Sequence, residues 1–366
     1  MNKLYVLFIL FISTSCNDRK SLFLGIQNYD LEDSINNTCL LSEIADSIEY
    51  YPLSSINNEL TNYLNQIDIQ LTDDYILLTH SHFGQLYSRY TGELIRDIDL
   101  GYPFEQPSYW WGNFVSKNYI TASGNGYYIR ERIEIKGKPY FKLLVRSLHN
   151  DTLISHVNLP SFYSFPINQD IIGEWKDTIM QRDSLTMFYY YDKNGNMLQK
   201  KYLKETLQSK RNILHLLNDN IFYHSEGNSK VYLLKDDLMF DFFNTKAGGI
   251  KNLHIGLDKL FFTYVFSREE YPIFINNDKI YKLSPINTIN IGLVNDIDGG
   301  FDFWPKNISY SGEIYSWYSV EELKSKVVHS NLKQMKNPEA VKRLKEMLNN
   351  LSKDINVIVA VLKEKK

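Results

Sequence analysis

The stretch LYSRYTGELIRDIDL (residues 86–100) contains the pattern that decides the fold, since an aromatic and aliphatic run, a turn at Gly92 and a second aliphatic run follow one another. Such a pattern predicts a β-hairpin, because Gly, Asn and Asp tolerate the backbone conformations that tight turns need. The pattern recurs around Asp151, Gly195, Asp237, Asp278 and Gly312, in LLVRSLHNDTLISHV, MFYYYDKNGNMLQKKYL, VYLLKDDLMFDFF, PIFINNDKIYKL and ISYSGEIYSWY. The sequence therefore predicts six hairpins.

The spacing of these turns predicts how the hairpins assemble. Successive turn residues are 59, 44, 42, 41 and 34 positions apart, and a four-stranded propeller blade takes roughly 40 to 45 residues. A further apolar stretch lies upstream of each hairpin, such as DDYILLTH before the first. One four-stranded blade cannot cover both of its apolar faces, whereas radial stacking covers them. We therefore expect an all-β, six-bladed propeller, although the 59-residue interval leaves room for a seventh blade.

The last fifty or so residues change character. Ser319 and Glu322 form a capping-box pattern for a helix through Val328, and Asn337 before Pro338 predicts the start of a second helix. The run INVIVAVL (355–362) is short and β-branched, which favours a strand. We expect this strand to pair with IEYYPL (48–53) and so to close the ring.

Composition supports a strand-rich globular protein. The chain of 366 residues is 43% hydrophobic and 14% aromatic, with 27 Tyr and 20 Phe, and aromatic residues favour strands. Its 40 basic and 43 acidic residues give a net charge of −3. Before the last thirty residues there is no basic stripe interleaved with aromatics, which argues against nucleic acid as a partner.

The N-terminus has the pattern of an export signal. A positive Lys3, the apolar run of residues 4–12 and a small-residue stretch lead to Cys16, and such a run is too short to span a bilayer. This resembles a bacterial lipoprotein signal, with cleavage before Cys16 and lipid attachment to its sulfur. Ser13 departs from the aliphatic residue usual at that place, and ordinary secretion is the alternative.

The predicted organisation is a signal peptide (1–15), a polar tether (16–40) and a propeller domain (41–366). We expect a cell-envelope protein, lipid-anchored to a bacterial membrane and not crossing it. A lipidated Cys16 leaves Cys39 as a free thiol, so no disulfide is predicted.

Three segments carry a resemblance to a family. These are LSEIADSIEYYPLSS (41–55), NDIDGGFDFWP (295–305) and DINVIVAVLK (354–363). With the repeats, they make the chain similar to the six-bladed β-propeller lipoproteins of Bacteroidetes over residues 41–366. The resemblance implies the fold and no particular activity. GYPFEQPSYWWGN (101–113) departs from the Gly- and Pro-rich loop usual in that family.

The sequence contains only weak signals for catalytic or metal-binding sites. Neither a nucleophile elbow nor a phosphate loop occurs. His80 and His82 share one strand face and could offer two metal ligands, but no third ligand is identifiable, so no metal or other cofactor is predicted. Asp296 and Asp298 resemble the start of a calcium loop that lacks its remaining ligands. They are interpreted as turn-forming carboxylates, with a site in the central channel as the alternative.

The aromatic loop Tyr109, Trp110 and Trp111 is the most suggestive candidate site, because flat aromatic faces bind sugar rings and peptide side chains. Packing between two blades is the competing interpretation. The leading hypothesis is a non-catalytic binding or scaffolding propeller for a glycan, peptide or partner protein. The alternatives are a propeller enzyme, such as a metal-dependent hydrolase, lactonase or lyase with its site in the channel, and a purely structural envelope subunit.

Overall fold

The described part of the chain is mostly β, with two α-helices near the C-terminus. The computed structural model describes residues 27–29, 39–54, 56, 67–80, 83–101, 113–115, 119–121, 124–136, 138–159, 164–166, 171–180, 183–192, 194–203, 211–217, 220–225, 227, 229–235, 238–245, 248–256, 259–266, 269–276, 279–283, 292–328 and 335–365.

The described strands form six sheets. The first sheet consists of β3 (Asp68–Leu71), β4 (Tyr75–His80), β5 (Phe83–Ser88) and β6 (Leu94–Asp99), and the second of β8 (Gly126–Ile135), β9 (Lys138–Ser147) and β10 (Leu153–Leu159). The third consists of β11 (Ser164–Pro166), β12 (Ile171–Met180), β13 (Asp183–Asp192) and β14 (Met197–Leu203). The core of the fourth consists of β15 (Arg211–Leu217), β16 (Asn220–Ser225), β17 (Lys230–Lys235) and β18 (Leu238–Thr245). The fifth consists of β19 (Gly249–Ile255), β20 (Lys259–Phe266), β21 (Glu269–Asn276) and β22 (Lys279–Lys282). The sixth consists of β23 (Asn307–Ile308), β24 (Ile314–Ser319), β25 (Val357–Glu364) and β2 (Ala45–Leu53).

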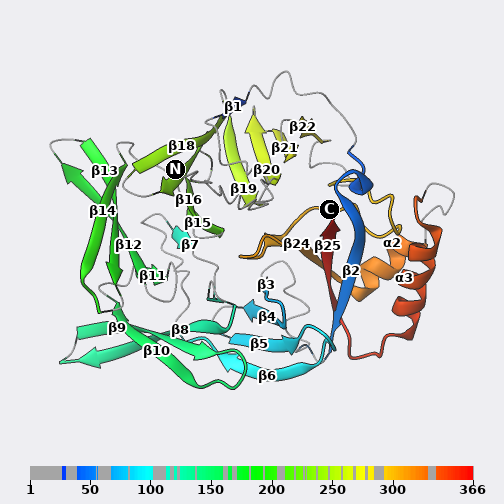
Figure 1. Cartoon of the computed structure of the whole chain (residues 1–366), viewed down its shortest axis with the longest axis horizontal. Helices are drawn as coiled ribbons and strands as arrows, with labels where there is room; N and C mark the ends of the chain where they lie inside the picture. The colour runs from blue at the N-terminus through cyan, green and yellow to red at the C-terminus, as the bar shows by residue number, and fades with distance from the viewer. Residues whose placement is uncertain are drawn as a thin grey trace, which may run out of the picture.

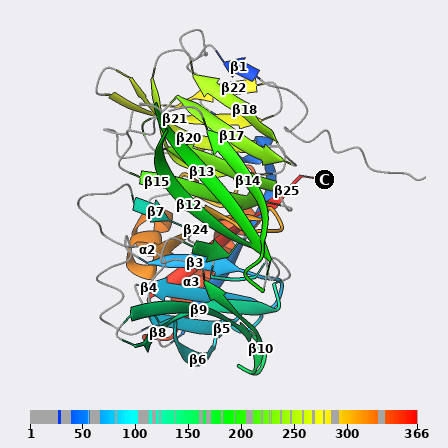
Figure 2. The ribbon, with the colours of Figure 1, turned by 90° about the vertical axis from the view of Figure 1, so that its left-hand side faces the viewer.

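The sheets follow one another around the molecule in chain order (Figure 1). The first and second lie at the bottom of that view, the third at the left, the fourth and fifth toward the top and the sixth at the right. Figure 2 faces the third sheet, in which β12, β13 and β14 run side by side. The prediction of an all-β chain built from antiparallel hairpins is confirmed.

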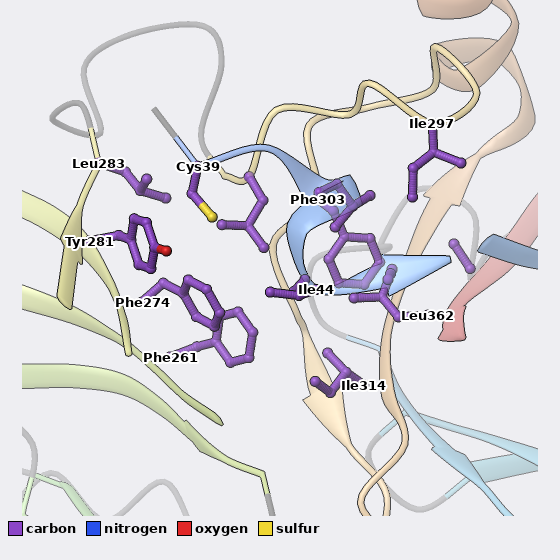
Figure 3. Close-up of a cluster of buried hydrophobic side chains, with 14 residues drawn as sticks. Cys39, Ile44, Phe261, Phe274, Tyr281, Leu283, Ile297, Phe303, Ile314 and Leu362 are labelled. Carbon is purple, nitrogen blue, oxygen red and sulfur yellow. The ribbon is translucent and has the colours of Figure 1, made fainter. Parts of the chain in front are cut away.

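Hydrophobic clusters fill the space between neighbouring sheets. Residues of the first and second sheets share one cluster, as do those of the fourth and fifth, the fifth and sixth, and the sixth and first. Figure 3 shows the cluster between the fifth and sixth sheets, with Phe261 and Phe274 on one side and Leu362 and Ile314 on the other. Each of these sheets therefore buries its apolar side chains against the next sheet.

The predicted turns join strands as expected in the first three sheets. Gly92 joins β5 to β6, Asp151 joins β9 to β10 and Gly195 joins β13 to β14, all with positive φ. Gly92 also has no room for a side chain, because a Cβ would lie 1.9 Å from the carbonyl oxygen of Pro52 on β2. The predicted turns at Asp237 and Asp278 lie outside the described residues.

Gly312 occupies a different place in its sheet. It joins β23 to β24, which are followed in the chain by a further strand of the same sheet, β25, whereas Gly92 joins the last two strands of the first sheet. This difference explains the short interval of 34 residues before Gly312.

The long interval between Gly92 and Asp151 contains an additional strand. β7 (Asn113–Val115) pairs in parallel with β15 and so extends the fourth sheet. A bridge between Ile120 and Tyr127 then adds a segment beside β8. Within the described ranges these segments add to existing sheets and form no seventh one. On the other side of the fourth sheet, β1 (Gln27–Tyr29) pairs in parallel with β18, although residues 16–40 were expected to be a tether.

The predicted C-terminal elements are confirmed. α2 (Val320–Val328) begins after Ser319, whose Oγ donates to Glu322 at 2.6 Å and accepts from the Glu322 backbone at 3.2 Å. α3 (Pro338–Asn350) begins after Asn337, whose Oδ1 accepts from the backbone of Ala340 at 3.1 Å. Both helices lie beside the sixth sheet at the margin of the molecule (Figure 1).

The final strand joins the two ends of the described chain. β25 pairs antiparallel with β2, with Leu362 opposite Ile48 and Val357 opposite Leu53. The short 3₁₀ helix η2 (Leu41–Glu43) leads into β2. Val357, Val359 and Val361 pack toward the first sheet, Ile358 toward the helices, and Ala360 and Leu362 toward the fifth sheet. β25 is buried on both faces, which is why its sequence is continuously apolar.

Candidate functional site

A groove of about 480 Å³, lined by both polar and apolar groups, lies where turns of three sheets meet. The first sheet contributes the turn between β3 and β4, the second the segment before β8 and the turn after β9, and the sixth the turn between β23 and β24. The lining residues are Leu71, Thr72, Asp73, Asp74, Tyr75, Ile120, Thr121, Gly124, Asn125, Ser147, His149, Tyr310 and Ser311. This volume is within the usual range for sites that bind small ligands.

The β3–β4 turn is held by hydrogen bonds of its own residues. Thr72 N donates to the carbonyl oxygen of Tyr75 at 2.9 Å, and Tyr75 N donates to Thr72 Oγ1 at 2.9 Å. A threonine that bonds the backbone three residues later fixes a tight turn. Tyr90 OH then donates to Asp74 Oδ1 at 2.8 Å. These bonds hold this wall of the groove and leave Asp73 exposed on it.

The wall from the second sheet is tied to the first sheet by Gln70. Its buried Oε1 accepts from the backbone N–H groups of Tyr119 and Ile120, at 2.8 and 2.9 Å. Across the groove, Tyr75 OH lies 3.2 Å from His149 Nδ1. The walls of the groove are therefore bound to one another through side chains of both sheets.

Arg89 lies behind the β3–β4 turn and links it to the sixth sheet. Its Nη1 donates to the carbonyl oxygen of Thr72 at 2.8 Å, and its two terminal nitrogens bind the carboxylate of Glu313, each at 2.8 Å. Burial lowers the pKa of Arg89, but the hydrogen bonds and charge of Glu313 raise it above its usual value. This guanidinium is therefore satisfied by Glu313 and the backbone.

A second guanidinium supports the wall that contains Ser147. Arg96 Nη2 donates to the carbonyl oxygens of Ser147 and Leu148, at 3.1 and 2.9 Å. Within the described part of the chain, neither Asp73 nor Asp74 forms an ion pair. Among the described residues that line the groove there is no Lys or Arg. These residues offer carboxylate, hydroxyl, amide and imidazole groups, and the charged pair Asp73 and Asp74 is acidic.

Several predicted site residues lie outside the described residues. These are Cys16, His82 and the aromatic loop Tyr109, Trp110 and Trp111. His80 is described at the end of β4, and it does not line the groove. Among the described residues no group of three or more His, Cys, Asp and Glu side chains could hold a metal ion.

Asp296 and Asp298 lie together in the buried loop between β22 and β23. Asp296 accepts from the backbone N–H and the Oγ of Ser42, at 2.9 and 2.6 Å. Asp298 accepts from Tyr50 OH at 2.9 Å, Asn295 Nδ2 at 2.8 Å and Gly300 N at 3.1 Å.

These bonds tie the loop to η2 and to β2. Burial raises the pKa of Asp298, although the three hydrogen bonds oppose that rise. The side chains of Asp296 and Asp298 are 9% and 3% exposed. The structure places neither residue in the groove.

The groove residues were not predicted as a site from the sequence, although several of them lie in the predicted strands and hairpins. Asp73 and Asp74 are the turn before the apolar run of β4, His149 lies in the second hairpin and Tyr310 in the last. One signal could have found them, because equivalent turns of radially stacked units lie on one face of the assembly. Polar residues in the turns of neighbouring units are then expected to meet.

Sequence comparison finds no matching family model and no matching curated protein. Among solved structures, the fold is similar to that of a Bacteroides fragilis protein described as exported, with a TM-score of 0.50 and 13% identity over 87% of this chain and 96% of that one. The β-propeller domain of the trilobed protease from Pyrococcus furiosus also aligns, with a TM-score of 0.38, 10% identity and coverage of 68% and 90%. TolB from Acinetobacter baumannii aligns with a TM-score of 0.30, 13% identity and coverage of 59% and 52%.

The likeness to the Bacteroides protein shows a common fold over most of both chains. Among the described residues, no helix is both long enough and apolar enough to span a membrane.

Proposed function

We propose that this protein is a lipoprotein of the bacterial cell envelope, anchored through Cys16, whose six sheets are the blades of a β-propeller. Its function is to bind a polar ligand, a glycan or a peptide, in the groove between Thr72, His149 and Tyr310. The observation that carries this function is the groove itself, a space of about 480 Å³ built from the turns of three neighbouring sheets.

The arrangement of the sheets supports the six-bladed propeller. Each sheet is followed around the molecule by the next one in the chain (Figure 1), and apolar clusters join neighbouring sheets. The pairing of β2 with β25 completes the sixth sheet from both ends of the chain. Non-covalent completion of one blade by the two ends is a way to close such a ring without leaving an exposed edge.

The chemistry of the groove supports a polar ligand. Its walls include the hydroxyl groups of Ser311 and Tyr310, the amide of Asn125 and the imidazole of His149. A few such polar groups in a concave site fix the orientation of a ligand through directed hydrogen bonds. Tyrosine adds an apolar ring against which a sugar or a side chain can pack.

The test is a ligand screen on the full-length chain in detergent. Thermal melting is recorded with a panel of oligosaccharides and short peptides, because a ligand that binds the folded state raises the melting temperature. Compounds that stabilise the chain are then tested on Ser311→Trp, which fills the groove, and on Asn194→Trp, which changes an exposed turn of the third sheet.

We expect Ser311→Trp to lose the stabilisation and Asn194→Trp to keep it. The proposal fails if no compound stabilises the wild type, or if the Ser311→Trp protein responds as the wild type does.

A further inference from the structure

We propose that the groove selects ligands that carry a primary ammonium group, such as a lysine side chain or an unacetylated amino sugar. This inference rests on the binding function proposed above and names the chemistry of the ligand. It comes from the charges that line the cavity and from the way in which the neighbouring cations are used.

The charge of the lining is one-sided. Asp73 and Asp74 both line the groove, while no Lys or Arg is found among the other lining residues that the structure describes. Asp74 accepts a hydrogen bond from Tyr90 OH, a neutral donor that leaves the carboxylate its charge. Phosphate, sulfate or carboxylate groups would be repelled here, whereas a cation is attracted.

The nearest arginines do not neutralise this charge. Arg89 binds Glu313 through two hydrogen bonds of 2.8 Å and donates a further hydrogen bond to the carbonyl oxygen of Thr72. Arg96 donates to backbone carbonyl oxygens of the second sheet. Arg89 is thus neutralised by Glu313, whereas Arg96 keeps its positive charge behind the wall. The two carboxylates of the described lining still outnumber this one unpaired guanidinium.

The remaining lining groups fit an ammonium group. An ammonium carries three donors and no acceptor, and the groove offers oxygen acceptors on Asp73, Asn125 and Ser311. The rings of Tyr75 and Tyr310 also line it, and aromatic rings attract cations. A compact ammonium can use the carboxylate, the neutral oxygens and a ring at once.

The experiment compares ligands that differ in the ammonium group alone. Isothermal titration of the full-length chain in detergent uses chitotriose and its fully N-acetylated form, and the N-terminally blocked peptides acetyl-Gly-Lys-Gly and acetyl-Gly-(acetyl-Lys)-Gly. We expect the ammonium member of at least one pair to bind about tenfold more tightly, because hydrogen bonds to charged groups are stronger than those to neutral groups. Preference within the sugar pair alone identifies a glycan ligand, and preference within the peptide pair alone identifies a protein ligand.

Two variants locate the effect. Asp73→Asn with Asp74→Asn removes both carboxylates from the groove, and Asp46→Asn removes one carboxylate at an exposed position of β2, outside the groove. We expect the double variant to lose the preference and the Asp46→Asn protein to keep it, with the melting temperatures of the free proteins as a check on folding.

Equal affinity for both members of each pair, with binding still lost in Ser311→Trp, would overturn the ammonium inference and leave the proposed binding function intact. A preference that survives in the double variant would also overturn it. No binding of any compound in the broader screen would instead defeat the proposed function.

Discussion

The guanidinium of Arg89 and the carboxylate of Glu313 form a two-pronged ion pair between the first and sixth sheets. Nη1 to Oε2 and Nη2 to Oε1 are both 2.8 Å, and the two side chains are 7% and 25% exposed. Arg89 follows β5, and Glu313 precedes β24. This pair joins two sheets and also supports the β3–β4 turn of the groove.

Arg89→Ala is expected to destabilise the protein by about 3 kcal/mol, because it leaves the Glu313 carboxylate without its partner in a partly buried site. The measurement is chemical denaturation followed by fluorescence. Lys251→Ala is the control, since its ion pair with Glu270 is 36% exposed on both sides and such pairs contribute less than about 1 kcal/mol. Equal losses in the two variants would contradict a special role for Arg89.

The burial of β25 on both faces gives a second prediction. Ile358 is fully buried against the helices and faces away from Val357 and Val359. Ile358→Ala is expected to lower the free energy of unfolding by about 2 to 5 kcal/mol, because it leaves a cavity in a packed core. Ile135→Ala, at a position that is 50% exposed, should change it by less than about 0.5 kcal/mol. Similar values for both, in denaturant titrations, would show that β25 is not packed as described.

The raised pKa of Asp298 leads us to expect that the stability of the folded chain depends on pH. Burial raises its pKa in the folded chain above the unfolded value, so the folded chain binds this proton more readily than the unfolded chain does. The contribution of Asp298 to stability is therefore fully present at low pH and is lost as the pH rises through its folded pKa. Relative to Asp298→Asn, which cannot titrate, the wild type should gain stability between about pH 7 and about pH 4. Melting temperatures of both proteins across this range check it, and a constant difference would refute it.

The two cysteines give a prediction about anchoring. Cys39 is 1% exposed, and burial raises its pKa to about 12, with Glu43 and Asp296 adding to the rise. A thiol that keeps its proton reacts slowly with alkylating and disulfide reagents. If Cys16 is lipidated, titration with a thiol reagent should find no reactive thiol in the native protein and one reactive thiol, that of Cys39, in denaturant. Two reactive thiols in denatured full-length protein from cells would show that Cys16 carries no lipid, and Cys16→Ser serves as the reference with one.

Local rules predicted much of the fold. Alternating runs and turn residues located the hairpins at Gly92, Asp151 and Gly195, and caps located both helices. The apolar run of β25 identified its pairing partner in β2. These features depend on residues close together in sequence or on a strand with both faces buried, and such signals are visible in a linear pattern.

Other features depend on contacts between distant segments and had no linear signal. The parallel pairing of β7 with β15 and of β1 with β18 joins segments that are far apart in the chain. Gly312 lies earlier in its sheet than Gly92 does, because the sixth sheet is completed by β2, a strand from the N-terminal part of the chain.

The groove combines the turn at Asp73 with Asn125, His149 and Tyr310. Its polar side chains meet through the order of the sheets around the molecule, which turn chemistry alone does not specify.

The position of a bound ligand tests the central claim most directly. A crystal structure of the chain with chitotriose should show the sugar in the groove between Tyr75, His149 and Tyr310, with an amino group near Asp73. Density for the sugar elsewhere, for example between the inner edges of the six sheets, with an empty groove would contradict the account.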